Sequence, residues 1–180
     1  IRPGQTFHNG DKLTAHDVKF SLERQMGPGS LASAAASMRR TIKSIEVVGD
    51  LTVKVQTTSP QIGLPAGLSR AVAPEGAIMP KAYIEKVGEE EFRKKPIGSG
   101  PFKFAKWEKG SHIELTRNDD YFKAGKPYLD RLVFKIMPDA SARLLAFERG
   151  EVDFLHWYIV PYDQVAKLRK DARFALLQKG

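Results

Sequence analysis

Short apolar segments with alternating strand-like and helix-like periodicity limit the fold of this 180-residue chain more than any other feature of its sequence. The second half predicts strands and helices in turn, over residues 129–137, 140–149, 152–158, 161–170 and 172–177. Asp139 can cap the first of these helices and Gly150 can end it. Strands separated by helices form strand–helix–strand units, so the pattern predicts an α/β fold.

The first half predicts a helix over 14–26 followed by a hairpin. Thr14 can cap the helix, with Asp17 three residues later as its capping-box partner. The apolar face of this helix is predicted to consist of Val18, Leu22 and Met26. Alternating apolar residues on both sides of Gly49-Asp50 predict two strands joined by a tight turn.

Prolines and glycines divide the middle of the chain. Residues 59–80 contain several prolines and predict a long irregular crossing, which is a candidate lip for a ligand site. Residues 81–95 predict a helix that ends before Pro96, and residues 102–107 and 111–117 predict a second hairpin.

Composition excludes several classes of protein. The longest apolar run, near residues 154–160, is interrupted by His156 and is far shorter than the roughly 20 residues of a membrane-spanning helix, which predicts a soluble protein. Cysteine is absent, so disulfides, thiolate nucleophiles and cysteine metal sites are excluded. The chain begins at Ile1 without an initiator Met or a signal segment, so we expect that its N-terminus was processed or cut.

The formal charge of +8 raises the question of a nucleic-acid partner. The basic residues are mixed with acidic ones, and the densest basic pairs are Arg39-Arg40 and Lys94-Lys95. No basic stretch is interleaved with aromatic residues that could stack on bases. The pattern therefore predicts a solvated basic surface and no nucleic-acid partner.

The sequence predicts that this protein is not an enzyme. Its four histidines, His8, His16, His112 and His156, lack a paired metal-ligand spacing. Gly98-Ser99-Gly100 lacks the further residues of a nucleophile elbow or a phosphate loop and predicts a turn, and His8 can hydrogen-bond locally near Asp11. We therefore expect no catalytic residue, no metal ligand and no cofactor.

Four ordered blocks carry a family resemblance. They are Ile1–Gly10 with Leu13–Arg24, Pro96–Phe104 with Trp107, Arg117–Asp130, and Pro138–Arg143 with Gly150–Asp153. Together they resemble the family 5 extracellular solute-binding proteins, the dipeptide, oligopeptide and nickel receptors of ABC importers. Many of these residues also have structural explanations, since glycines permit turns and Asp139 and Gly150 are ordinary helix caps.

The resemblance implies an α/β fold that is part of a periplasmic-binding-protein-like lobe, class II and peptide-receptor type, with an inserted α+β subdomain. It implies that residues 1–95 form the inserted subdomain and that residues 96–180 form part of the main lobe. The second lobe is expected to be absent from this chain, which would then be an internal fragment with poor ligand affinity of its own.

The resemblance also implies the substrate-binding component of an ABC importer, which captures peptides or a similar small solute and passes it to a membrane permease. Such a receptor is periplasmic or otherwise extracytoplasmic, membrane-anchored if it is a lipoprotein, and a monomer when full length. Strands of open α/β sheets deliver ligand contacts at their carboxyl ends, so the ligand-binding candidates are Phe154, His156, Trp157 and Tyr158. Packing of these aromatic residues against the missing lobe stays an alternative, as does a sensing or scaffold module without uptake.

Overall fold

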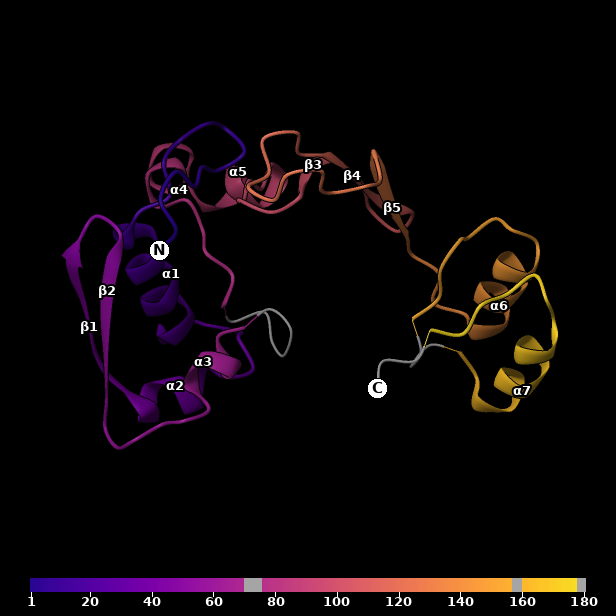
Figure 1. Cartoon of the computed structure of the whole chain (residues 1–180), viewed down its shortest axis with the longest axis horizontal. Coiled ribbons are helices and arrows are strands. Elements are labelled where there is room, and N and C mark those ends of the chain that lie inside the picture. Colours follow the sequence, from indigo (N-terminus) through magenta and orange to yellow (C-terminus); the bar gives the residue numbers. More distant parts are fainter. Residues whose placement is uncertain (70–75, 157–159, 178–180) are drawn as a thin grey trace. The chain divides into compact units, whose positions relative to one another are not determined.

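The computed structural model describes residues 1–69, 76–156 and 160–177, which group into two compact units (Figure 1). Unit 1 comprises Ile1–Lys106 and Glu114–Leu132, and unit 2 comprises Trp107–Ile113 and Val133–Gly180. This grouping reflects contacts within the chain alone. The boundary predicted between residues 95 and 96 therefore stays a prediction.

Helices and strands both contribute, as an α/β fold requires. The helices are α1 (Ala15–Met26), α2 (Ala35–Thr41), α3 (Leu64–Gly67), α4 (Lys81–Val87), α5 (Glu89–Lys94), α6 (Ala140–Glu148) and α7 (Tyr162–Lys170). The strands are β1 (Ile42–Gly49), β2 (Thr52–Thr57), β3 (Phe102–Glu108), β4 (His112–Arg117) and β5 (Arg131–Lys135). No helix within the described residues combines the length and apolar character needed to cross a membrane.

The core of unit 1 lies between α1, α2 and the hairpin of β1 and β2, which stands beside α1 in Figure 1. The buried cluster consists of Leu22, Met38, Ile42 and Ile45, with Val18 and Met26 packed against it. This confirms the apolar face predicted for the first helix. The hairpin is also confirmed, but its turn is Asp50-Leu51, one residue later than predicted, because a register shift lets Gly49 pair with Thr52.

The predicted start of α1 is confirmed by its capping contacts. The backbone N–H and the hydroxyl of Thr14 both donate to Asp17 Oδ2 at 2.9 Å. The carboxylate thus satisfies a donor that the first helical turn leaves without an intrahelical partner.

A second stripe of α1 holds the extended segment that precedes α4. Three side chains at intervals of four residues bond backbone groups at intervals of two, in the pairs Asp17–Lys81, Ser21–Met79 and Gln25–Ala77, at 2.9, 2.8 and 3.3 Å. Four helical residues rise about 6 Å and two extended residues rise about 6.6 Å, so the two repeats match. We call this arrangement the polar ladder.

Glycine divides the helix that was predicted over residues 81–95. Gly88 has a φ of +83°, a conformation that other residues adopt only with strain, and the chain forms α4 before it and α5 after it. The bidentate pair of Arg24 and Glu89 links α5 back to α1. The guanidinium of Arg24 lowers the pKa of Glu89 through these hydrogen bonds.

The second sheet has the order β3-β4-β5. The predicted hairpin of β3 and β4 is confirmed, with Gly110 at a φ of +77° in its turn. The strand predicted over residues 129–137 is present as β5, but its predicted burial is wrong, because Phe134 is 55% exposed and Ile136 is 40% exposed. Among the described residues β5 is an edge strand that pairs with β4 alone.

Two further strand predictions are wrong within the described residues. Residues 152–156 and 172–177 form no strand, whereas 157 and 158 lie outside the described residues. Apolar residues in sequence are not sufficient for a strand, because a strand also needs a neighbour that completes its hydrogen bonds. The helix predicted over 161–170 is confirmed as α7.

Removing one rung of the polar ladder tests its contribution to stability. Ser21 is fully buried, so Ser21→Ala should leave the Met79 N–H without its acceptor and lower the free energy of unfolding by about 1–3 kcal/mol. Urea unfolding of the intact protein measures the change. Ser59→Ala, at an exposed position, is the matched control and should change stability by less than about 0.5 kcal/mol. Equal small effects of both substitutions would show that the ladder adds nothing.

Candidate functional site

The candidate ligand-binding residues follow α6, whose two ends form as the sequence predicts. Asp139 Oδ1 accepts the N–H of Ala142 at 2.7 Å and caps the first turn. At the other end the N–H groups of Gly150 and Glu151 donate to the carbonyls of Phe147 and Ala146, the pattern of a Schellman motif. Gly150 has a φ of +73°, which turns the chain out of the helix.

Phe154 and His156 lie close together in the segment that follows. Their ring centroids are 6.5 Å apart with an interplanar angle of 83°, an edge-on arrangement. Phe154 is 64% exposed, so it presents an apolar surface to solvent. The other two candidates, Trp157 and Tyr158, lie outside the described residues. The structure thus brings together two of the four predicted residues.

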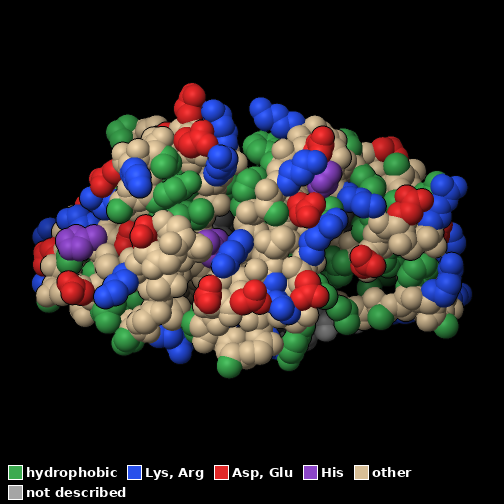
Figure 2. All heavy atoms as spheres, turned by 90° about the horizontal axis from the view of Figure 1, so that it is seen from above, with side chains coloured by type: hydrophobic (Ala, Val, Ile, Leu, Met, Phe, Trp, Pro, Cys, Tyr) green, Lys and Arg blue, Asp and Glu red, His purple; other side chains and the backbone are tan. Residues whose placement is uncertain are grey.

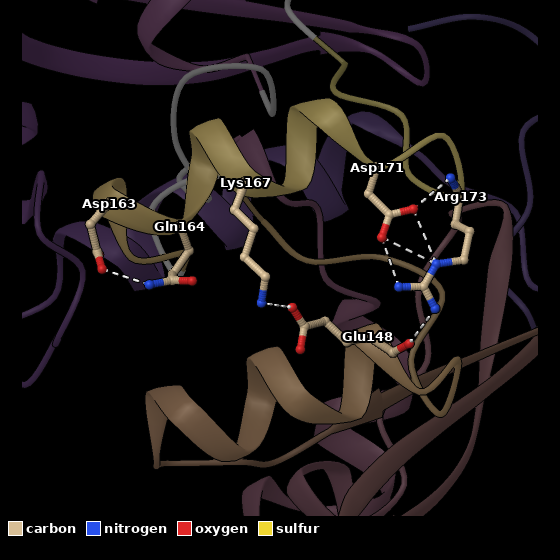
Figure 3. A network of polar contacts seen from close by, with 6 residues as sticks. All are labelled: Glu148, Asp163, Gln164, Lys167, Asp171 and Arg173. Carbon is tan, nitrogen blue, oxygen red and sulfur yellow. Dashed lines mark hydrogen bonds and ion pairs between the residues drawn. The ribbon is translucent and has the colours of Figure 1, made fainter.

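Contacts between α6, α7 and the residues after α7 close this segment into a loop (Figure 3). Lys167 Nζ lies 2.7 Å from Glu148 Oε1, and Arg173 Nη1 donates to the Glu148 carbonyl at 3.4 Å. The rings of Phe147 and Phe174 stack with centroids 4.7 Å apart. These contacts, which we call the α6–α7 brace, join residues on both sides of the loop that carries Phe154 and His156.

A local ion pair orients the arginine of the brace. Asp171 accepts hydrogen bonds from the Arg173 guanidinium, and its Oδ2 lies 2.7 Å from Nη2 (Figure 3). These hydrogen bonds lower the pKa of Asp171 to about 2 and raise the pKa of Arg173. The pair therefore stays charged over the whole neutral and mildly acidic range.

Sequence reasoning did not find the residues of the brace. Glu148 and Lys167 are nineteen residues apart, and Glu148 and Arg173 are twenty-five apart. Such spacings have no helical or strand period, so the only local signal was the pair of predicted helices with a short connection between them.

Three of the four histidines contact different parts of the chain. His8 bonds the backbone of Gly98 and Gly100, His112 bonds Ser111, and His156 contacts Phe154. Across the described ranges, no group of three or more histidine, aspartate and glutamate side chains has the geometry of a metal site. The local hydrogen bond predicted for His8 near Asp11 is wrong, because the ring of His8 bonds Gly98 and Gly100, which are distant in sequence.

The other candidate lip, residues 59–80, is partly accounted for by packing in unit 1. Leu64 and Leu68, in and beside α3, pack against the core cluster, and the polar ladder holds the end of the segment. A hollow of about 250 Å³ lies nearby, lined by Phe7, Asp11, Lys12, Thr14, His16, Asp17, Pro80, Lys81, Ala82 and Tyr83. Its buried carboxylate, Asp17, already has hydrogen-bond partners.

Basic and acidic side chains are mixed across the face shown in Figure 2. Several lysines and arginines pair with acids, as in Lys54–Glu46, Lys81–Glu85, Arg117–Asp130 and Arg131–Glu114. Pairs in which both side chains are exposed, such as Lys54–Glu46 and Lys81–Glu85, contribute little to stability and leave a solvated surface.

Comparison with known proteins agrees with the fold and identifies the class. The family model described as "Bacterial extracellular solute-binding proteins, family 5 Middle" matches residues 1–178. The chain therefore belongs to the family 5 bacterial extracellular solute-binding proteins, as its four sequence blocks predicted. Its fold is that of the peptide-receptor type of periplasmic binding protein.

Individual relatives cover the chain almost completely. The oligopeptide-binding protein AppA of Bacillus subtilis is 37% identical over 93% of this chain and 31% of its own length. Its structure with a nonapeptide has a TM-score of 0.77 at 36% identity, covering 94% of this chain and 33% of AppA.

Two further relatives have been solved in complex with other ligands. AgaA from A. tumefaciens R10, in complex with agropinic acid, has a TM-score of 0.83 at 34% identity, over 93% of this chain and 33% of its own. NikZ from Campylobacter jejuni, in complex with Ni(L-His), has a TM-score of 0.78 at 27% identity, over 98% and 34%. The chain thus spans about a third of the length of the relatives that it matches.

A double-mutant cycle tests the stacked pair in the brace. Phe147→Ala and Phe174→Ala should each destabilise the protein, with a coupling energy of about 0.5–1.5 kcal/mol because the rings contact each other. Denaturant unfolding of the intact protein measures the cycle. Tyr162→Ala is the aromatic control, since Tyr162 is 93% exposed, and its effect should add to that of Phe147→Ala. Additivity in both cycles would contradict the brace.

Proposed function

We propose that the protein containing this chain is the substrate-binding component of an ABC importer. It captures a peptide or a similar small solute outside the cytoplasmic membrane and delivers it to a membrane permease. The observation that carries this proposal is the family match over residues 1–178, together with the likeness to AppA in its nonapeptide complex.

Peptides are the first ligand class to consider. AppA, which binds oligopeptides, is 37% identical to this chain, whereas the glutathione-binding protein GsiB of Pectobacterium atrosepticum is 28% identical. Relatives in complex with agropinic acid and with a nickel–histidine chelate share the same fold at similar coverage. The scaffold therefore supports binding of small solutes in general, and the residues around the ligand choose among them.

We place the ligand contacts on the loop between α6 and α7. The exposed ring of Phe154 offers an apolar surface, and His156, which meets it edge-on, adds polar ring nitrogens. Trp157 and Tyr158 complete the proposed set. Aromatic residues with polar tips suit peptide-type ligands, which need apolar contact and hydrogen bonds at once.

The mechanism needs no chemical step. Ligand held between two lobes stabilises a closed arrangement over an open one, and the closed form docks on the permease. In this scheme residues 1–95 form an inserted subdomain and residues 96–180 form part of the main lobe. The whole receptor acts as a monomer outside the membrane, attached to it if the protein carries a lipid anchor.

A thermal-shift screen of the full-length mature protein tests the proposed function. Peptides of different length, opine acids and nickel–histidine should be compared, and a specific ligand should raise the melting temperature by mass action. No shift with any of these compounds would contradict the proposal. If the protein binds a ligand, but cells that lack the permease take up that ligand as fast as cells that have it, a sensing module is favoured instead.

The loop residues can be tested with the ligand that the screen finds. Phe154→Ala should weaken binding roughly 5- to 30-fold, which is the loss expected when a contact aromatic is truncated at an interface. Isothermal titration calorimetry measures the affinity. Leu31→Ala is the control, because Leu31 is also apolar and fully exposed but lies in unit 1. Equal affinities of both variants would show that Phe154 does not contact the ligand, and would not contradict the proposed function.

A further inference from the structure

His8 joins the first segment of the chain to a turn ninety residues later. Its backbone N–H donates to the Gly98 carbonyl at 2.8 Å, and its Nδ1 lies 3.1 Å from the Gly98 nitrogen, whose N–H it accepts. Its Nε2 lies 3.1 Å from the Gly100 carbonyl oxygen. Both ring nitrogens are therefore held by backbone groups of one short turn.

These partners determine the protonation state of the ring. Nδ1 faces an N–H donor and must carry a lone pair, whereas Nε2 faces a carbonyl and must carry the proton. The imidazole is thus neutral, with its proton on Nε2. A second proton would put an N–H at Nδ1 opposite the N–H of Gly98, where two donors repel.

A third segment fixes the turn on its other side. Asn118, which is 5% exposed, donates through Nδ2 to the same Gly100 carbonyl at 3.0 Å. Its backbone N–H donates to the Pro101 carbonyl at 2.9 Å. Because the turn is held by Asn118, it cannot easily follow a movement of the His8 ring.

The charged groups near His8 give no compensation for a second proton. Lys103 on β3 acts on the ring with a like charge, and its own ion-pair partner is Asp120 at 3.6 Å. Asp11 belongs to the turn of His8 itself, but its carboxylate accepts a hydrogen bond from Asn9 Nδ2 at 2.6 Å.

We propose that His8 is a pH-sensitive latch, which holds the first segment of the chain to the 98–100 turn when its ring is neutral and releases the Gly98 N–H when the ring is protonated. The device lies entirely in unit 1 and uses none of the proposed ligand-binding residues, so it can be tested without a ligand.

The direction of the pH effect follows from the environment of the ring. Burial lowers the pKa of His8 below its ordinary value of 6.5, the Gly100 hydrogen bond acts in the opposite direction, and the charge of Lys103 lowers it further. Above pH 6.5 the ring is neutral in the folded and the unfolded chain, and the full stability of the latch is present. As the pH falls from 6.5 through the lowered folded-state pKa, the unfolded chain binds the proton first and this stability is lost.

Amide hydrogen exchange and imidazole NMR in the intact protein test the latch directly. At pH values below the pKa of His8, the protection factor of the Gly98 amide, corrected for intrinsic exchange, should fall about tenfold because a partly buried donor loses its acceptor. The amide of Asn118, whose acceptor does not titrate, should keep its protection factor. Nitrogen chemical shifts of His8 should show the Nε2–H tautomer at neutral pH and a pKa below 6.5.

A pair of glutamine variants separates the latch from general acid sensitivity. His8→Gln keeps a neutral side chain that does not titrate, so the pH dependence of Gly98 protection should disappear, whereas His112→Gln on β4 should leave it unchanged. If His8→Gln does not fold, the titration of the unmodified protein decides. A His8 pKa at or above 6.5, or constant Gly98 protection through the titration, would overturn the proposal.

Discussion

The polar ladder on α1 is the constraint on which unit 1 depends. A helix with a rise of about 1.5 Å per residue can bond an extended segment in register only when every fourth side chain meets every second backbone group. Asp17, Ser21 and Gln25 meet this condition against residues 77–81. The neighbouring stripe of α1 is apolar and packs on α2 and the β1–β2 hairpin. One helix therefore organises two layers that are distant in sequence.

The two units use polar contacts of different kinds. In unit 1 the side chains of Ser21 and Asn118 are buried and hydrogen-bonded, so the loss of a partner there is costly. In unit 2 the brace contains an exposed ion pair, with the Lys167 side chain 66% exposed, and such pairs are worth little by themselves. The stacked phenylalanines contribute more to the stability of the brace. The ion pair mainly fixes how α6 and α7 align.

This difference bears on how a receptor of this family works. A binding loop must be held well enough to limit the entropy lost when ligand is bound, yet it must adjust to solutes of different shape. The loop between α6 and α7 has a rigid entry, because the Schellman motif ends α6 at a defined residue. Between its anchored ends it exposes Phe154, which is the apolar contact of the proposed ligand site.

The sequence by itself determined the local structure and the family. Thr14 with Asp17, Asp139 and Gly150 specify helix ends through contacts within a few residues, and the period of Val18, Leu22 and Met26 specifies a packed face. The wrong predictions are the strand over 152–158, as far as it is described (to residue 156), the strand over 172–177, and the burial of β5. A strand requires a neighbouring strand, and burial requires another element packed against it. Only the tertiary structure decided the polar ladder, the α6–α7 brace and the His8 latch, since each joins residues whose separation leaves no periodic trace in the sequence.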